Sequence, residues 1–449
     1  MKRTVLLVLV AIIAASASSG GRPSRADACA FAVAPTAYEG PKDRSLDLAA
    51  MNLAAFNLID PGDPYFGLPR LAKGPRQVRV SVEPVVPPIL LKSIGWIESS
   101  IDQTRNSPFG GIGPALISSD CGHGIMQVTS GMTVPLGTGG AVTPEQLLVA
   151  THYAYNIDRG AVMLADKWND APASRPIAGT DTDGDPSIVE NWYFAVWSYN
   201  GFTGPGANRS NHPLDPIYAP WPRTPYSCGP SNDGFGHDRS KYPYQELVWG
   251  CASHPPVVDG KQLWQPFALS LPDLTNAKWS GPLQLANWLA PYVNMDIPSP
   301  SPSHKDPTQS PLASAAAAIL GAPELDVQAS DISLSPNDKK TLTSEDVDLG
   351  NDGTGILVWG AVSSASWLTL SPAAGVALGP DVTCTAGASC VRDGTLTLTV
   401  NPAQIPKGGG KATVTISSPQ SSETSVLNVT VNGGGSSPGK TGIPGVTRN

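Results

Sequence analysis

One carboxylate stands out in the sequence because it interrupts an apolar helical pattern. Glu98 lies in the run VPPILLKSIGWIESSID, where Leu90, Ile94, Ile97 and Ile101 recur at helical spacing. At about 100° per residue, Glu98 falls roughly 80° from the centre of this stripe, at the boundary of the buried face. Desolvation raises the pKa of a carboxyl group in such a place, so that it can stay protonated near neutral pH and act as a general acid.

Two further motifs follow Glu98 in an order that adds to this chemistry. Gly124-Ile125-Met126-Gln127 lies where closely spaced glycines indicate a tight turn or a close backbone approach. Tyr199-Asn200 stands at the end of a predicted helix that Gly201 terminates. With Trp96-Ile97-Glu98-Ser99, these motifs make residues 85–205 resemble the soluble lytic transglycosylase (SLT) family, peptidoglycan lyases that share the lysozyme-like fold.

The resemblance implies a mainly α, lysozyme-like catalytic domain in which Glu98 serves first as acid and then as base. Such an enzyme cleaves the β-1,4 bond between N-acetylmuramic acid (MurNAc) and N-acetylglucosamine (GlcNAc). The muramyl 6-hydroxyl, in place of water, closes a 1,6-anhydro ring, and neither a cofactor nor a metal ion is needed. The motifs place six residues at the substrate: Ser99, Gly124, Met126, Gln127, Tyr199 and Asn200. We expect the Tyr199 hydroxyl to point at Glu98, with core packing as the alternative, and a helix cap is the alternative for Asn200.

Two other classes of function stay open at this point. A muramidase or chitinase would use water and a second carboxylate, for which Asp102, Asp120 and Glu190 are candidates. Surface charge or helix capping explains each of these acids as well, and one helical turn places Asp102 beside Glu98 rather than across a sugar ring. The other class is a non-catalytic glycan-binding or structural protein of the cell wall. The intact motifs count against this alternative.

The run DTDGDPSIVE, residues 181–190, begins like a calcium-binding loop. Pro186 stands where such loops need glycine, and no acid occupies their twelfth position. We interpret the run as a turn that caps the next helix, with calcium binding as the alternative.

Three helices must position the motifs. The first follows Pro87-Pro88 and carries Glu98. The second opens with the capping box Thr143-Pro144-Glu145-Gln146 and continues past Asn156. The third begins at Asp185-Pro186 and ends before Gly201.

The 449 residues exceed what one hydrophobic core usually organises, so we expect two domains. Pro and Ser recur without apolar periodicity after residue 296, as in an extended linker. Beyond it, period-2 runs such as TLTLTV and ATVTI predict a β-sandwich. Through the segments SASWLTLSPAAG and GGGKATVTISS, this part resembles immunoglobulin-like modules of the BACON type. The predicted order is a signal peptide (1–28), the transglycosylase domain (29–296), the linker (297–324), the sandwich (325–432) and a disordered tail (433–449).

Composition and the N-terminus indicate an exported protein. The chain opens with a basic start, an apolar stretch and small-residue cleavage patterns, which together are typical of a secretory signal peptide. No later stretch is long and apolar enough for a transmembrane segment. A net charge of -8 without any Lys/Arg block argues against nucleic acid as a partner. We therefore expect a secreted, cell-wall-associated protein that binds peptidoglycan strands, with a second glycan or wall polymer as a candidate ligand of the sandwich.

Six cysteines in an exported chain predict disulfides. Cys384 and Cys390 bracket a short loop and are expected to pair. Three connectivities are open to Cys29, Cys121, Cys228 and Cys251, of which we favour Cys228 with Cys251, and a lipid anchor on Cys29 is a further alternative. The aromatic-rich segment 218–264 around this pair is a candidate wall of a glycan groove, or a long loop that uses its rings and disulfide only to stay folded.

Overall fold

The computed structural model describes residues 29, 31, 34–105, 111–132, 141–205, 207, 209–274, 296–335, 342–383 and 392–432. The expected signal peptide, the C-terminal tail and the expected Cys384–Cys390 pair lie outside these residues. Within them, every helix is too short or too polar to cross a membrane.

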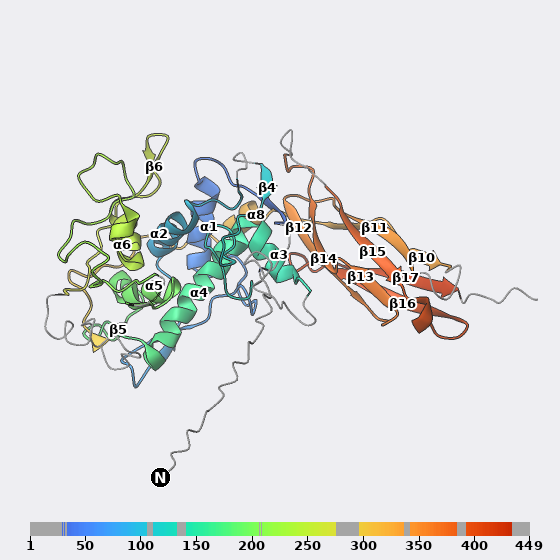
Figure 1. Cartoon of the computed structure of the whole chain (residues 1–449), viewed down its shortest axis with the longest axis horizontal. Coiled ribbons are helices and arrows are strands. Elements are labelled where there is room, and N and C mark those ends of the chain that lie inside the picture. The colour runs from blue at the N-terminus through green and yellow to red at the C-terminus, as the bar shows by residue number, and fades with distance from the viewer. Residues whose placement is uncertain are drawn as a thin grey trace, which may run out of the picture.

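Within the described residues of the N-terminal region, six helices and several pairs of short strands surround one apolar core (Figure 1). The helices are α1 (Ser45–Ala55), α2 (Pro88–Ser99), α3 (Pro144–Thr151), α4 (Tyr153–Ser174), α5 (Tyr193–Tyr199) and α6 (Tyr244–Ser253). The strand pairs are β1 (Thr36–Tyr38) with β4 (Ile112–Pro114), β2 (Leu71–Lys73) with β3 (Val80–Val82), β5 (Ile177–Ala178) with β8 (Asp296–Ile297), and β6 (Val257–Val258) with β7 (Lys261–Gln262). The long helix α4 packs against α1, α3 and α5, while α2 packs against α6.

The expectation of a mainly α, lysozyme-like domain is wrong. Helix and strand each make up 25% of the structure, and long turns and two-stranded sheets separate the helices. The predicted second helix is broken at His152, whose backbone is extended and separates α3 from α4. The predicted third helix has only seven α-helical residues, in α5, after a 3-10 turn at Val189–Trp192. Neither interruption contains a proline or glycine, so local sequence alone does not explain them.

Helix α2 agrees closely with its prediction and presents Glu98 in its last turn. The side chains of Leu90, Ile94, Ile97 and Ile101 are all buried, as the helical stripe predicts. The helix ends where Ser100 and Ile101 adopt left-handed backbone conformations. Glu98 therefore stands at the point where the buried stripe meets an open face.

The start of α2 is capped by a residue far away in the sequence. Pro87, at the N-cap position, has no side-chain acceptor for the first free N–H groups. Asp306 supplies one, since its Oδ2 accepts a hydrogen bond of 2.7 Å from the Ile89 backbone N–H. A carboxylate in this position also complements the helix dipole.

Asp306 belongs to the segment predicted as the linker, which lies against the N-terminal region. His304 donates its backbone N–H to the buried Glu190 at 2.7 Å, and its ring is hydrogen bonded to the same carboxylate. The Ser299 backbone N–H donates to Asp181 at 2.7 Å. Further along, α8 (Ala315–Leu320) packs against α1. Residues 298–314, here called the connecting segment, are thus held to the N-terminal region by specific contacts.

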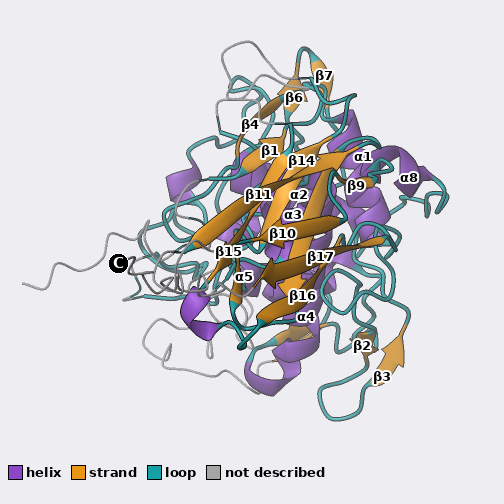
Figure 2. Ribbon diagram, turned by 90° about the vertical axis from the view of Figure 1, so that its right-hand side faces the viewer, coloured by secondary structure: helices purple, strands orange, loops and turns teal. Residues whose placement is uncertain are grey.

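The C-terminal region is β-rich, as expected, and forms two sheets (Figure 2). One sheet has the order β10 (Asp331–Leu334), β17 (Thr424–Asn432), β16 (Gly409–Ser417), β12 (Ile356–Ser363), β14 (Ala374–Leu378). The other has the order β13 (Leu368–Ser371), β15 (Gly394–Val400), β11 (Thr343–Asn351), β9 (Leu325–Val327). Alternate residues of the two longest neighbouring strands enter the core between the sheets: Ala412, Val414, Ile416, Leu427, Val429 and Val431.

The two regions share a packed interface rather than a flexible joint. Val358 and Ala374, in the five-stranded sheet, are buried within the apolar core of the N-terminal region. Pro144, at the start of α3, lies so close to Gly360 that a Cβ there would come within 2.8 Å of the proline ring. In Figure 1, α3 lies beside β12 and β14. The sandwich therefore adjoins the N-terminal region on the side of α3, while α5 and α6 lie at the far end.

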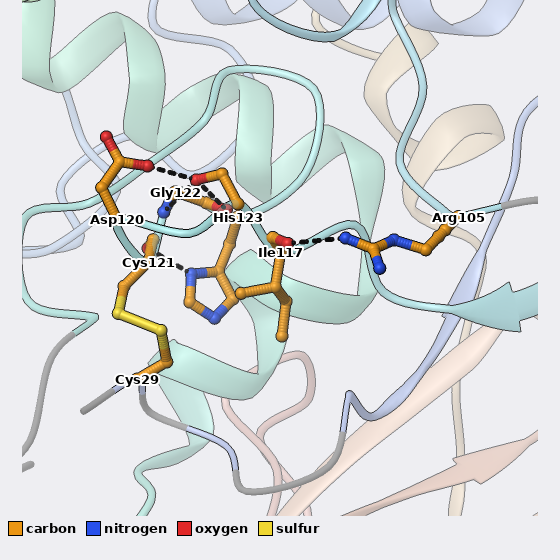
Figure 3. The surroundings of a disulfide bond; sticks show 8 residues. Cys29, Arg105, Ile117, Asp120, Cys121, Gly122 and His123 are labelled. Atoms are coloured by element: carbon orange, nitrogen blue, oxygen red, sulfur yellow. Dashed lines mark hydrogen bonds between the residues drawn. A yellow bond between two sulfur atoms is a disulfide. The ribbon is translucent and has the colours of Figure 1, made fainter. Parts of the chain in front are cut away.

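Two disulfides join the four cysteines that the structure describes. Cys228 pairs with Cys251, which confirms the favoured connectivity, and Cys29 pairs with Cys121. Figure 3 shows the Cys29–Cys121 disulfide beside His123, whose ring nitrogen Nδ1 lies 2.7 Å from the Cys121 carbonyl oxygen. Disulfides are typical of an oxidising compartment, and so they are consistent with an extracellular protein.

Candidate active site

A cavity of about 280 Å³ opens where the end of α2 faces the segment between α5 and α6. Its lining residues are Ile97, Glu98, Asn200, Arg209, Asn211, Ile217, Tyr218, Arg239, Ser240, Tyr242, Tyr244 and Leu247. Most of them come from residues 200–247, so the aromatic-rich segment does form one wall of a cavity. The Cys228–Cys251 disulfide links that wall to α6.

Glu98 is the one carboxylate among the described residues that line this cavity. Its side chain is half-buried, and Oε1 accepts a hydrogen bond of 2.5 Å from the Tyr244 hydroxyl. The other oxygen, Oε2, accepts no hydrogen bond from the described residues, yet it is not among the buried unsatisfied atoms. Oε2 is therefore open to the cavity, where a ligand oxygen can reach it.

The surroundings of Glu98 raise its pKa to about 7. Burial is the largest cause, because the low-dielectric surroundings disfavour the charged form. The hydrogen bond from Tyr244 and the charges of Arg239 and Arg209 lower the pKa, whereas the charge of Asp120 raises it. A carboxyl group with a pKa near neutrality can both donate and accept a proton at physiological pH.

Tyr244 is held as a hydrogen-bond donor to this carboxyl group. Burial, followed by the charge of Glu98, raises the pKa of the Tyr244 hydroxyl well above its usual value. The phenol therefore keeps its proton and directs it at Oε1. Because one oxygen is occupied in this way, the exchangeable proton of Glu98 is directed to Oε2, on the cavity side.

Tyr244→Phe should move the pH dependence of activity. The variant loses a hydrogen bond that lowers the Glu98 pKa, so that pKa should rise above about 7. A general acid works only while protonated, so the loss of kcat/KM with rising pH should shift to higher pH, and kcat should fall by about tenfold. Tyr226→Phe, which removes a hydroxyl from the same aromatic-rich segment but outside the cavity lining, is the matched control. An unchanged pH profile in Tyr244→Phe would refute this positioning role.

Four of the predicted substrate residues lie behind Glu98 rather than in the cavity lining. The Ser99 hydroxyl donates to the Ile125 carbonyl oxygen at 2.9 Å, which ties α2 to the segment 124–127. Met126 is fully buried, and its backbone N–H donates to Asn156 at 2.8 Å. Gln127 folds back so that its Nε2 donates to the Gly124 carbonyl oxygen at 2.8 Å. These residues hold the end of α2 in place, and none of them lines the cavity that Glu98 does.

The expected contact between Tyr199 and Glu98 is replaced by another. The Tyr199 hydroxyl donates to the Met126 carbonyl oxygen at 2.8 Å, although the charge of Glu98 still helps to raise the Tyr199 pKa. Tyr244 makes the contact to Glu98 that we expected from Tyr199. Asn200, by contrast, does line the cavity, where its Oδ1 accepts a hydrogen bond of 3.1 Å from Asn211.

The other acids considered for catalysis lie outside the cavity lining. Asp102 forms an ion pair of 2.5 Å with Arg44, and Glu190 is buried against the connecting segment. Asp120 is exposed and accepts a hydrogen bond from Ser118 at 2.5 Å. The calcium alternative also finds no support, because no group of three or more His, Cys, Asp or Glu residues in the described ranges could hold a metal ion.

Sequence reasoning missed the three cavity residues that lower the pKa of Glu98, namely Tyr244, Arg239 and Arg209. All three lie beyond residue 205, outside the stretch that resembles the SLT family. One signal was present, since YQELVWGC predicts a short helix that begins at Tyr244 and ends at a disulfide. Nothing local to that helix indicates that its first residue meets Glu98.

Comparisons with known proteins add no family assignment. No protein-family model matches the chain, and no curated protein matches it. A structure of the ASH/PapD-like domain of human CEP192 (PapD-like domain 7) matches at 12% sequence identity over 29% of this chain and 94% of that domain, with a TM-score of 0.20. The VesB protease of Vibrio cholerae matches at 10% identity over 24% of this chain and 31% of the protease, with a TM-score of 0.17. TM-scores this low indicate neither a shared fold nor a shared function.

Proposed function

We propose that the protein is a secreted lytic transglycosylase that cleaves the β-1,4 MurNAc–GlcNAc bond of peptidoglycan, with Glu98 as its acid and base. The observation that carries the proposal is the lone carboxyl group, with a pKa of about 7, that faces a cavity. The order of the three motifs that surround Glu98 supports the same reaction. A hydrolase that inverts the anomeric configuration would place a second carboxylate roughly 6.5–9.5 Å from Glu98, across the sugar. The described residues that line the cavity offer none.

The chemistry needs only this one group from the protein. Glu98 donates its proton to the glycosidic oxygen as the bond from that oxygen to muramyl C1 breaks. The resulting carboxylate then accepts the proton of the muramyl 6-hydroxyl, whose oxygen bonds to C1 and closes the anhydro ring. Glu98 is protonated again at the end, and no water is consumed.

The products of digestion test this reaction. Purified peptidoglycan should yield 1,6-anhydromuramyl ends, which mass spectrometry distinguishes from reducing ends because they lack one water. Asp102→Asn should remain active, because Asp102 pairs with Arg44 outside the cavity lining. Asp120→Asn should also remain active, because Asp120 affects Glu98 only through its charge.

Reducing ends alone, together with an inactive Asp120→Asn variant, would instead identify a hydrolase with two carboxylates. The absence of any glycan cleavage would leave only a glycan-binding role.

The sandwich and the location of the protein enter the proposal in a supporting role. The two disulfides support secretion, and a wall substrate implies association with the cell wall. We propose that the sandwich binds a second glycan or wall polymer. Its docking beside α3, away from the cavity, leaves the site accessible while the sandwich is bound.

A further inference from the structure

Two arginines share the cavity with Glu98. Arg209 lies on the segment after α5, and Arg239 begins the 3-10 turn Arg239–Lys241 before α6. Neither arginine forms an ion pair with any residue that the structure describes. Two unpaired cations in one cavity are notable in a chain with a net charge of -8.

The carboxylates near the cavity already have other partners. Glu246 forms a buried ion pair with Arg223, at 2.9 Å. Asp238 accepts hydrogen bonds from the backbone and the hydroxyl of Ser240. Asp215 accepts the Ile217 backbone N–H at 3.0 Å. When Glu98 is protonated, the ionised side chains that line the cavity are therefore the two arginines.

Arg239 is held in place by one hydrogen bond, which leaves most of its N–H donors free to bind a ligand. Its Nη2 donates to the Ile97 carbonyl oxygen at 2.5 Å, in the last turn of α2, where a cation complements the helix dipole. A guanidinium group has five N–H donors in a planar fork, so this contact leaves four. Helix capping alone would explain Arg239, but it does not explain Arg209, which lines the cavity and donates no hydrogen bond to another described residue.

On the basis of the proposed glycan-cleaving function, we propose that Arg209 and Arg239 form a carboxylate-binding subsite beside Glu98, which selects glycans that carry an acidic substituent next to the cleaved bond. Arginine matches a carboxylate with two parallel N–H donors, which gives geometric specificity as well as affinity. Both arginines are exposed, so a bound carboxylate keeps part of its contact with water and added salt weakens the interaction. A neutral chitin-type glycan would leave both cations unpaired and should be a poor substrate.

Two sources of this carboxylate exist in a peptidoglycan strand. One is the lactyl carboxyl group of MurNAc, which is free when the peptide has been removed. The other is a carboxylate of the attached stem peptide. Both present the same chemistry to the arginines, and substrates that contain only one of them distinguish the sources.

The test uses the full chain and four defined oligosaccharides of equal length. These are a peptide-free GlcNAc–MurNAc oligomer, the same oligomer with its lactyl carboxyl groups converted to neutral amides, a peptide-bearing oligomer and a chitin oligomer. Arg209→Gln and Arg239→Gln should each lower kcat/KM by about tenfold to a hundredfold on a carboxylate-bearing oligomer. Their activity on the amidated oligomer should change little. The arginine variants should lose more kcat/KM on one of the two carboxylate-bearing oligomers, and that oligomer contains the carboxylate that the arginines bind.

Arg105→Gln is the matched control, since Arg105 is also an exposed arginine that donates to a backbone carbonyl, that of Ile117, but it lies outside the cavity lining (Figure 3). It should leave all four rates unchanged. Arg209→Lys and Arg239→Lys should recover part of the lost activity, because the charge remains and the fork is lost. If Arg239→Gln loosens α2, Arg209→Gln still tests the subsite.

Binding by the inactive Glu98→Gln variant separates this inference from the proposed function. That variant should bind the peptide-free oligomer about tenfold more tightly than its amidated form, because charge-assisted hydrogen bonds to the arginines are lost on amidation, and added salt should weaken the preference. Equal affinity for the two forms, or arginine variants with wild-type discrimination, would overturn the subsite. Preferential binding without cleavage by the wild-type protein would uphold the subsite and refute the proposed reaction.

Discussion

Glu98→Gln should abolish glycan cleavage while the protein stays folded. Glutamine keeps the shape of the side chain and an oxygen that can accept the Tyr244 hydrogen bond, but it has no proton to transfer. The loss of general-acid catalysis should lower kcat by more than about a hundredfold. The release of anhydromuramyl products from peptidoglycan measures this loss, and cleavage at a near wild-type rate would exclude Glu98 as the acid.

The same variant carries a stability signature. The Glu98 pKa is about 7 in the folded protein, against 4.5 for an ordinary glutamate, so the folded state holds this proton more tightly than the unfolded chain. The stabilisation from the protonated form is complete below pH 4.5 and is lost as the pH rises through about 7. At pH 8, Glu98→Gln should therefore unfold with a free energy higher than that of the wild type, by on the order of 1–3 kcal/mol. Urea denaturation at pH 4 and pH 8 measures the difference, and a variant that is less stable at pH 8 would contradict it.

Gly124→Ala should cause a large loss of stability. Gly124 has a φ of +64°, and an added Cβ would come within 2.5 Å of the Asn156 amide nitrogen and would also overlap the amide of Gln103. Those two buried amides bind the backbone of Val149, Ala150 and other segments around them. Left-handed strain and overpacking together should lower the free energy of unfolding by about 3–5 kcal/mol, as measured by urea denaturation.

Gly234→Ala is the matched control for this substitution. Gly234 also has a left-handed backbone, with a φ of +86°, but its added Cβ would meet no atom within 4 Å. Gly234→Ala should lower the free energy of unfolding by about 1–2 kcal/mol, which is the cost of the backbone strain alone. Equal losses in the two variants would show that the packing around Gly124 contributes nothing.

The part of the site that the sequence could predict is the part that helical periodicity controls. The stripe of Leu90, Ile94, Ile97 and Ile101 placed Glu98 at the edge of a buried face, and the half-buried side chain agrees. Cysteine spacing likewise favoured the Cys228–Cys251 pair that the structure contains. Both inferences rest on residues that are close together in the sequence: one helix in the first case and a separation of 23 residues in the second.

The contacts that complete the site come from distant segments. Tyr244 lies 146 residues after Glu98, and the hydrogen bond of Arg239 to Ile97 spans 142 residues. Periodicity cannot indicate which turn of one helix meets the first residue of another, because that depends on how the whole wall folds. The same limit explains the fold-class error, since stripes locate helices but do not reveal the short strand pairs and long turns between them.

The cap that Asp306 provides to α2 has a consequence for how such a chain can be inherited. A recombination event at residue 297, where the composition suggests a boundary, would join the helix that carries Glu98 to a new neighbour and leave its first turn uncapped. It would also remove Val358 and Ala374 from the apolar core that they help to close. The two regions are therefore poor candidates for exchange as independent cassettes.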